Sequence, residues 1–361
     1  MKKRKYGFML TSVAALSLVL AACGGDEGDT STDSNTGGSD TDTTETTDEA
    51  KFSLAMVTDT SGIDDKSFNQ ATWEGAKEFA AEHGLKEEEG YAYLQSNSDS
   101  DYETNLNQLA RRDFSLIFAA GFSIAEALDK IAGQQQDTNF TIIDSVVEGK
   151  DNVASVLFKE HEGSFLAGVA AAMTSKTGTV GFIGGMESEV ITRFEVGFTE
   201  GVKAVNPDAK IEVQYVGSWS DSAKANNIAN LMYSNGADVI MHAAGGAGNG
   251  LFTAAKDIKE KDANANVWVI GVDSDQYAEG DTANGNVTLT SMIKNLQAAV
   301  NDISSKAIEG NFPGGEVITY GIKENGVYLS ENGGMTDEVK QAVAEYTEKI
   351  KSGEITVPDT K

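Results

Sequence analysis

The sequence predicts an α/β protein made of two doubly wound units in tandem, each a parallel sheet with helices packed on its faces. Short apolar runs alternate with amphipathic helical segments from residue 51 to residue 275, and this alternation is typical of parallel strands joined by helical crossovers. It occurs as two successive series. Roughly 310 residues follow the polar N-terminal part, more than a single hydrophobic core usually holds, so two lobes are expected.

The first series begins with a buried strand and a helix that ends at Gly84. Glycine readily adopts the left-handed conformation that terminates helices. Two further strand–helix pairs and a last strand follow along the chain. The expected strands are 51–59, 91–98, 114–121 and 139–144, and the expected helices are 67–84, 101–113 and 123–136.

The second series begins with a helix and repeats the same order of elements. It is not an obvious sequence repeat of the first. Only three prolines occur in the whole chain, so the elements are rarely interrupted. The expected helices are 163–176, 189–206, 221–236 and 250–262, and the expected strands are 179–185, 210–218, 237–246 and 266–275.

Two lobes require the chain to cross between them at a hinge. We expect the first lobe to comprise residues 51–158 with about 277–312, and the second to comprise 159–272 with about 315–361. The crossings are expected near residues 144–160, 271–280 and 310–318.

The N-terminus has the features of a lipoprotein signal peptide. Basic residues at positions 2–5 precede an apolar stretch that ends at Cys23, and small residues stand directly before this cysteine. Such a stretch is too short for a durable membrane span. We expect residues 1–22 to be removed, the Cys23 thiol to be diacylated (palmitate included), and the protein to be held on the extracytoplasmic face of the cell membrane. An ordinary signal peptide with a chance cysteine is the alternative.

Residues 23–50 have the composition of a flexible tether. After Cys23 they are almost entirely Gly, Ser, Thr, Asp and Glu, with nine acidic residues and no basic one, which leaves too little apolar surface to fold. The net charge of the chain is −28, which argues against nucleic acid or an anionic lipid face as a partner. Cys23 is the only cysteine, so no disulfide is expected in the mature domain.

Unusual residues gather where predicted strands end. In open parallel sheets, ligands bind beyond the carboxyl ends of the strands, so these residues would surround one cleft if the two sheets face each other there. They are Asp59 and Phe68 after the first strand, residues 121–126 after the third, and Trp219, residues 243–250 and Asp273 in the second series.

The sequence lacks the spacing required by several kinds of metal or catalytic site. The acidic segments 59–65 and 97–105 do not have the glycine and glutamate positions of an EF-hand. The three histidines form no i,i+4 pair for zinc, and there is no Gly-x-Ser-x-Gly elbow. A carboxylate pair acting as general acid and base stays open, because acidic residues are abundant. We expect no cofactor and no metal.

Two features of the second series favour a binding cleft. The glycines of residues 245–250 do not have the Gly-x-Gly-x-x-Gly spacing of a dinucleotide loop, and we expect them to let backbone amides approach a ligand. Trp219 lies in a polar turn between Ser218 and Ser220, so we expect it to line a cleft rather than to fill a core.

Six motifs are spread over residues 51–330: GIDDKSFNQATWEG (62–75), FIGGMESEVITRFEVGFTEGV (182–202), VGSWSD (216–221), HAAGGAGNG (242–250), VIGVDSDQ (269–276) and TSMIKNLQAAV (290–300). Together they resemble the basic membrane protein family of bacterial substrate-binding lipoproteins, whose best understood members are purine nucleoside receptors of ABC transporters. The resemblance implies a type I periplasmic-binding-protein fold, in which two hinged lobes hold a nucleoside in the cleft between them.

The resemblance also implies roles for individual residues. Phe68 and Trp219 would stack on the two faces of the base, with Trp219 standing where the family usually has Phe. Asn69 would hydrogen-bond the edge of the base. Asp273 would bind the ribose hydroxyls, with Lys294 beside it.

Further residues complete the expected site. Gly246 would supply a backbone contact, and Asp59 would form part of the pocket wall. Glu126 stands where the family often has Asp near the base, and the extra methylene leaves the base preference open. Asp64 and Asp65 are expected to cap the first helix, where carboxylates meet free amides and the positive end of the dipole.

These features together predict a lipid-anchored, monomeric receptor that captures a nucleoside, purine favoured, and delivers it to an ABC permease. No reaction is needed: stacking on an aromatic ring contributes about 1–3 kcal/mol, and a carboxylate can accept from two vicinal hydroxyls. A ligand sensor of the same fold and a secreted enzyme acting on nucleosides or sugars are the alternatives. A sugar or an autoinducer remains open as the ligand.

Overall fold

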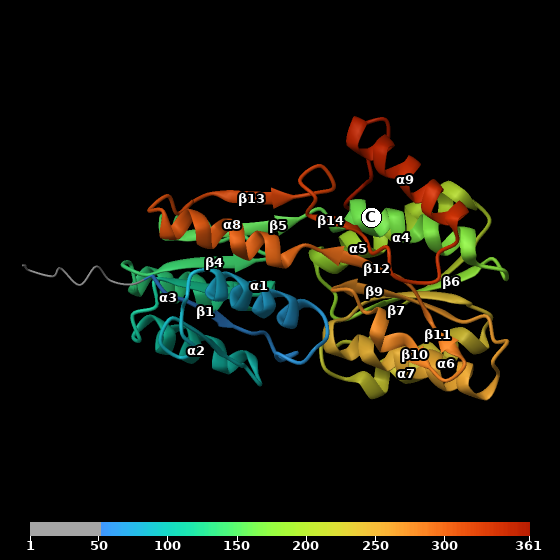
Figure 1. The fold of residues 1–361 in the computed structure, drawn as a ribbon, viewed down its shortest axis with the longest axis horizontal. Helices are drawn as coiled ribbons and strands as arrows, with labels where there is room; N and C mark the ends of the chain where they lie inside the picture. Colours follow the sequence, from blue (N-terminus) through green and yellow to red (C-terminus); the bar gives the residue numbers. More distant parts are fainter. Residues whose placement is uncertain (1–51) are drawn as a thin grey trace, which may run out of the picture. The chain divides into compact units, whose positions relative to one another are not determined.

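The computed structural model describes residues 52–361, which contain two six-stranded sheets (Figure 1). The first sheet has the order β13-β5-β4-β3-β1-β2, and all its neighbouring strands are parallel. The strands are β1 (Leu54–Val57), β2 (Tyr91–Leu94), β3 (Leu116–Ala120), β4 (Asn139–Ile143), β5 (Val153–Phe158) and β13 (Val317–Tyr320).

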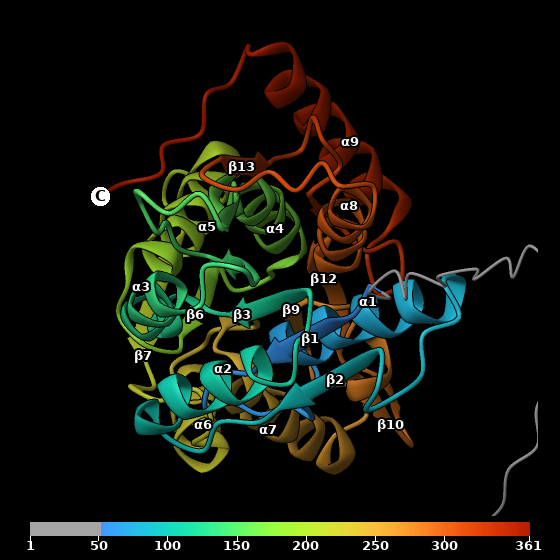
Figure 2. The same ribbon diagram turned by 90° about the vertical axis from the view of Figure 1, so that its left-hand side faces the viewer.

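Helices cover both faces of the first sheet because its strands are apolar on both sides. Leu54 and Met56 of β1 pack in the cluster that contains α1 and α8, whereas Ala55 and Val57 pack in the cluster that contains α2 and α3. This is the two-residue alternation of a strand buried on both faces. Figures 1 and 2 show β1 between α1 and α2. The helices are α1 (Phe68–Glu82), α2 (Tyr102–Ala110), α3 (Ala125–Gln134) and α8 (Leu296–Ile308).

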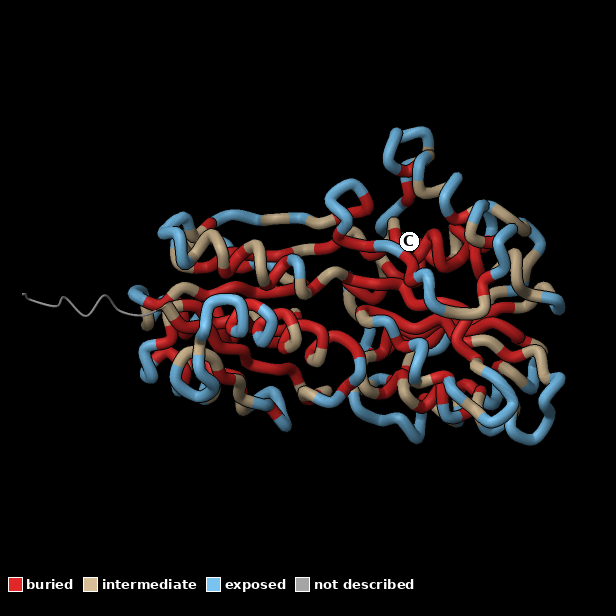
Figure 3. Tube along the Cα trace, in the orientation of Figure 1, coloured by how far each residue is buried: buried red, intermediate tan, exposed pale blue. Residues whose placement is uncertain are grey.

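The second sheet repeats this arrangement with the order β14-β12-β9-β8-β6-β7, and only β14 is antiparallel to its neighbour. Its strands are β6 (Thr179–Gly184), β7 (Lys210–Tyr215), β8 (Val239–Ala243), β9 (Trp268–Asp273), β12 (Thr288–Lys294) and β14 (Val327–Leu329). The central strands of both sheets are buried, whereas the edge strands β2, β7 and β13 are mostly half-buried or exposed (Figure 3). The predicted class, two doubly wound parallel-sheet lobes, is confirmed.

The faces of the second sheet are covered in the same way. Val239 and Met241 of β8 pack in the cluster that contains α4, α5 and α9, and Ile240 packs in the cluster that contains α6 and α7. The helices are α4 (Glu160–Thr174), α5 (Glu189–Val205), α6 (Ser222–Ser234), α7 (Asn249–Lys261) and α9 (Asp337–Ser352). The short strands β10 (Asp281–Thr282) and β11 (Gly285–Asn286) form a hairpin, and the 3-10 turns are η1 (Asp99–Asp101), η2 (Phe122–Ile124), η3 (Gly245–Gly248) and η4 (Tyr277–Gly280).

Within residues 52–361, the chain passes between the two sheets three times. It crosses from β5 into α4 near residue 159, from β12 into α8 near residue 295, and from β13 into β14 within residues 321–326. The expected crossings near 271–280 and 310–318 are therefore wrong. The expected lobe assignment also differs: β12 pairs with β9 in the second sheet, and β13 pairs with β5 in the first. Pairing with a distant strand decides sheet membership, and local sequence does not record it.

The predicted signal peptide, the lipidation site Cys23 and the tether lie outside the described residues. Within residues 52–361, no helix has the length and apolar character needed to cross a lipid bilayer.

Candidate ligand-binding site

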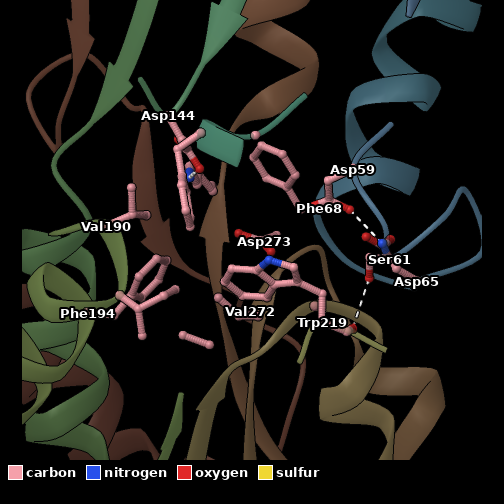
Figure 4. A pocket seen from close by; sticks show the side chains of 16 residues that line it. Asp59, Ser61, Asp65, Phe68, Asp144, Val190, Phe194, Trp219, Val272 and Asp273 are labelled. Atoms are coloured by element: carbon pink, nitrogen blue, oxygen red, sulfur yellow. Dashed lines mark hydrogen bonds and ion pairs between the residues drawn. The ribbon is translucent and has the colours of Figure 1, made fainter. Parts of the chain in front are cut away.

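A cavity lies where the carboxyl ends of strands from both sheets meet (Figure 4). It measures about 50 Å³, whereas ligand pockets usually measure roughly 300–1,000 Å³. The lobes must therefore separate to admit a ligand larger than a few water molecules. The lining residues are Asp59, Ser61, Asp65, Phe68, Gly121, Phe122, Asp144, Val190, Ile191, Phe194, Trp219, Ala243, Gly245, Val272, Asp273 and Lys294.

The loop between β1 and α1 closes the cavity against the second lobe. Ser61 Oγ donates to the carbonyl oxygen of Trp219 at 3.2 Å and accepts from the backbone N–H of Gly246 at 2.9 Å. Ser67 Oγ donates to Asp273 Oδ2 at 2.5 Å. These bonds join residues that are far apart in the chain and belong to different lobes, so the structure is a closed conformation held by polar contacts.

Aromatic side chains enter the cavity from both lobes. Phe68 is the first residue of α1 and is 9% exposed, and Trp219 comes from the loop between β7 and α6. Phe122 meets Trp219 edge to face, with ring centroids 5.9 Å apart. A side chain at Gly185 would collide with the indole, since a Cβ there would lie 2.2 Å from Cζ3 of Trp219. Glycine at this position therefore makes room for tryptophan.

The cavity is lined by four buried aspartates: Asp59, Asp65, Asp144 and Asp273. Asp144 follows β4 and Asp273 ends β9, the fourth strand in chain order within each sheet. Both have positive φ, 69° and 64°, an unusual conformation for residues other than glycine that is often found at functional sites. Burial raises the pKa of Asp59 and of Asp273 to about 7. Each of these two carboxyl groups is therefore partly protonated near pH 7.

Lys294 neutralises part of this acidic cluster. The side chain is 1% exposed, and its Nζ lies 2.5 Å from Asp144 Oδ2 and 3.2 Å from Glu160 Oε1. Burial alone would lower the pKa of the Lys294 ammonium, but Asp144 and Glu160 together raise it. Glu160 also pairs with Arg193 at 2.7 Å. Nζ lies 5.0 Å from the ring centroid of Phe68, so the ammonium also makes a cation–π contact with this ring.

Asn69 and Asp65 organise the loop that carries Asp59. Asn69 is fully buried; its Nδ2 donates to Asp59 Oδ1 at 2.8 Å and to Asp65 Oδ2 at 3.0 Å. Asp65 accepts from the backbone N–H groups of Ser67, Asn69 and Gln70. Asp65 therefore caps the first helix, as expected, whereas Asp64 is exposed and makes no such bond among residues 52–361.

The structure brings together five of the eight predicted ligand-binding residues: Asp59, Phe68, Trp219, Asp273 and Lys294. The other three do not line the cavity. The side-chain amide of Asn69 donates to Asp59, and the backbone N–H of Gly246 donates to Ser61 Oγ rather than pointing into the cavity. Glu126 is exposed in the first turn of α3.

Sequence reasoning missed Ser61, Asp144 and Phe194, and it included Phe122 only as part of the strand-end segment 121–126. Asp144 had the same signal as Asp273, because each aspartate directly follows an apolar run and precedes a serine. Phe194 lies in the middle of α5 and had no signal, since an aromatic residue on an apolar helix face is usually core. Within residues 52–361, no three His, Cys, Asp or Glu side chains are arranged to hold a metal ion.

Curated relatives match over most or all of the chain. The CD4+ T-cell-stimulating antigen of Listeria innocua serovar 6a is 46% identical over 366 residues, covering 99% of both chains. The ABC transporter nucleoside-binding protein BmpA of Lactococcus lactis subsp. cremoris is 46% identical over 310 residues, covering 84% of this chain and 88% of the relative. Basic membrane protein A of Borreliella afzelii is 35% identical over 304 residues.

Solved structures share the fold. An ABC transporter solute-binding protein from Aeropyrum pernix K1 superposes with a TM-score of 0.76 and 26% identity, covering 85% of this chain and 94% of its own. A second solute-binding protein, from Conexibacter woesei, has a TM-score of 0.63 and 21% identity, which shows the fold alone. The fold is that of type I periplasmic-binding proteins. The family described as "ABC transporter substrate-binding protein PnrA-like" matches residues 52–361, and the chain belongs to this family of extracytoplasmic, membrane-associated ABC transporter substrate-binding proteins.

Proposed function

We propose that this protein is a lipid-anchored receptor that captures nucleosides, with purines favoured, and delivers them to an ABC permease. The observation that carries the proposal is the pairing of Phe68 and Trp219 with the buried carboxylate of Asp273 around one interlobe cavity. The aromatic faces suit a planar base, and the carboxylate suits vicinal hydroxyls. The nucleoside-binding name of the Lactococcus relative supports the same ligand class.

Each lining group has a proposed part in binding. Phe68 and Trp219 stack on the base, and Asp273 accepts from the ribose hydroxyls. Asp144 and Asp59 accept from further donors of the ligand, because both are buried carboxylates that line the cavity. The ammonium of Lys294 neutralises part of the negative charge of the buried carboxylates. Nothing in this arrangement requires a covalent step.

Calorimetric titration with inosine, guanosine, adenosine and cytidine tests the proposal, together with ribose and galactose as sugars. We expect the purine nucleosides to bind more tightly than cytidine and the sugars not to bind. Unchanged nucleoside after incubation with the pure protein would separate a receptor from an enzyme. If no nucleoside binds, or if a sugar binds instead, the proposal is wrong.

Nucleoside affinity is expected to fall as the pH is lowered below about 7. The pKa values of Asp59 and Asp273 are raised to about 7 by burial, and only the ionised carboxylate of Asp273 accepts from two hydroxyls at once. Below this pH a proton must leave before the ligand binds, which weakens affinity by up to about tenfold per pH unit. Titrations at pH 8, 7 and 6 measure the effect, and Asp273→Asn should flatten it. An affinity that is constant over this range would contradict the prediction.

The raised pKa of Asp59 has the opposite effect on the stability of the empty protein, which it increases at low pH. Because the folded-state pKa of Asp59, about 7, lies above its ordinary value of 3.8, this carboxyl favours folding at low pH, and its contribution is lost as the pH rises from about 4 to about 7. Melting the parent and the Asp59→Asn variant across this range isolates the contribution. The difference between them should change with pH in this interval and level off above it.

Cys23→Ala is expected to release the protein from membranes without unfolding it. The motivation is the cysteine directly after the small residues of the predicted signal, followed by an acidic stretch that would not hold the domain on an anionic surface. Fractionation of cells that produce each form, with circular dichroism of the released variant, measures the outcome. A variant that stays with the membrane fraction would exclude the lipid as the anchor.

A further inference from the structure

The orientation of Trp219 is determined at both its backbone and its ring. Its carbonyl oxygen accepts from Ser61 Oγ at 3.2 Å and from the backbone N–H of Ala247 at 2.8 Å. The Cε3–Cζ3 edge of the indole packs on Gly185, where an added Cβ would lie 2.2–2.5 Å from these carbons. The pyrrole nitrogen Nε1 belongs to the opposite edge, so it points away from Gly185.

The indole N–H of Trp219 is a buried donor without an acceptor. Nε1 is inaccessible to solvent, and no atom of residues 52–361 accepts from it. Buried indole N–H groups usually have a partner, and Trp268 in β9 illustrates the rule by donating to Asn266 Oδ1 at 3.3 Å. In Figure 4 the nitrogen lies on the ring edge that is turned toward the Asp273 side chain, and both residues line the cavity.

The position of the N–H restricts what it can bind. The N–H bond lies in the plane of the indole, so a base stacked on the ring face cannot accept from it. The acceptor must lie beyond the ring edge, on the side of Asp273. A hydroxyl that donates its proton to a carboxylate keeps lone pairs that can accept from a second group. A ribose hydroxyl held by Asp273 therefore fits both groups.

We propose that Trp219 Nε1–H donates to a ribose hydroxyl oxygen that itself donates to Asp273, so that Trp219 selects ribonucleosides over analogues lacking that hydroxyl. The inference rests on the proposed nucleoside-binding function and refines it. A phenylalanine at this position would stack on a base but could not make this bond. Trp219 is thus a specificity-determining residue in addition to a stacking surface.

The test is a matrix of proteins and ligands. The parent, Trp219→Phe and the control Trp268→Phe are titrated with inosine, 2′-deoxyinosine and 3′-deoxyinosine. Trp219→Phe keeps an aromatic face but removes the donor. Its affinity for inosine should fall about 3- to 10-fold, the net worth of one hydrogen bond, while its affinity for the analogue lacking the contacted hydroxyl should stay within twofold of the parent's. Trp268→Phe, at the other end of β9, should bind all three ligands like the parent.

A spectroscopic readout tests the same bond without relying on affinity. The chain has three tryptophans, so a ¹⁵N-labelled sample gives three indole N–H signals, and Trp219→Phe identifies the relevant one. Inosine should move this signal downfield, and the analogue lacking the contacted hydroxyl should move it less.

Three results would overturn the inference while leaving nucleoside binding intact. Equal losses for all three ligands in Trp219→Phe would mean that only stacking changed. A shift of the pH dependence of binding without a difference between ligands would mean that the N–H serves the Asp273 carboxylate directly. An indole signal that does not respond to inosine would exclude the bond. Failure of the parent to bind any of the three ligands would instead overturn the proposed function.

Discussion

Lys294→Met is expected to destabilise the folded protein by about 3–5 kcal/mol, because it leaves buried carboxylates without their counter-charge. Nζ of Lys294 is the closest cation to Asp144, at 2.5 Å, and it also pairs with Glu160, which is 0% exposed. Glu160 retains Arg193 in the variant, so the uncompensated charge falls on Asp144. Urea denaturation of the empty protein measures the free energy of unfolding.

The position of this lysine makes its loss affect binding as well as stability. Lys294 ends β12 directly before the crossing into α8, and Glu160 follows the crossing from β5. The ion pairs therefore lie where the two lobes are joined. We expect Lys294→Met to lose measurable nucleoside binding even under conditions in which it is folded, because the ammonium positions both Asp144 and the ring of Phe68.

Two further variants, a control and a rescue, test the predicted loss of stability. Lys306→Met removes a half-exposed partner of Asp302 at 2.7 Å and should change stability by no more than about 1 kcal/mol. The double variant Lys294→Met with Asp144→Asn should recover part of the lost stability, because the orphaned charge is removed. If Lys294→Met loses little stability, or if the double variant recovers none of it, the ion pair between Lys294 and Asp144 does not stabilise the fold as proposed.

Phe68→Ala and Trp219→Ala are each expected to weaken nucleoside binding by about 1–3 kcal/mol, or about five- to hundred-fold. Each truncation removes one stacking face while the other remains. Asp273→Ala should weaken binding of ribosides and matter little for a free base, because the proposed partners of its carboxylate are the ribose hydroxyls. Calorimetric titration of each variant with inosine and hypoxanthine separates these effects.

A purely structural role for the aromatic residues predicts a different pattern. Phe68 also packs in the core cluster of α1, so truncation could act through folding. In that case the empty variant would melt earlier and affinity would fall only where the protein unfolds. Phe52→Ala is a matched control, since Phe52 packs edge to face on Phe79 at 5.8 Å and does not line the cavity. Parent-like affinity in Phe68→Ala and Trp219→Ala would exclude the stacking role.

Local sequence patterns determined the elements and the chemical character of this protein. The alternation of apolar runs and amphipathic helices predicted the strands and helices of residues 51–275 except β5 (Val153–Phe158), which was missed. Burial on both faces imposes that alternation on parallel strands. The residues at the strand ends also identified Asp59, Phe68, Trp219 and Asp273, since ligands of such sheets bind there. The resemblance added Lys294 and the expectation of a nucleoside ligand.

Only the tertiary structure decided which elements share a sheet and which polar groups meet. Strands β12 and β13 lie in the sheets opposite to those expected, because their partners are selected by hydrogen bonding over long distances in the chain. The side chain of Glu126 is exposed, whereas Asp144, from the end of β4, meets Lys294 from the end of β12. The unpartnered N–H of Trp219 likewise has no sequence signature. Its direction depends on Gly185 and on the Ser61 bond from the other lobe, and contacts between segments so far apart are formed only by folding.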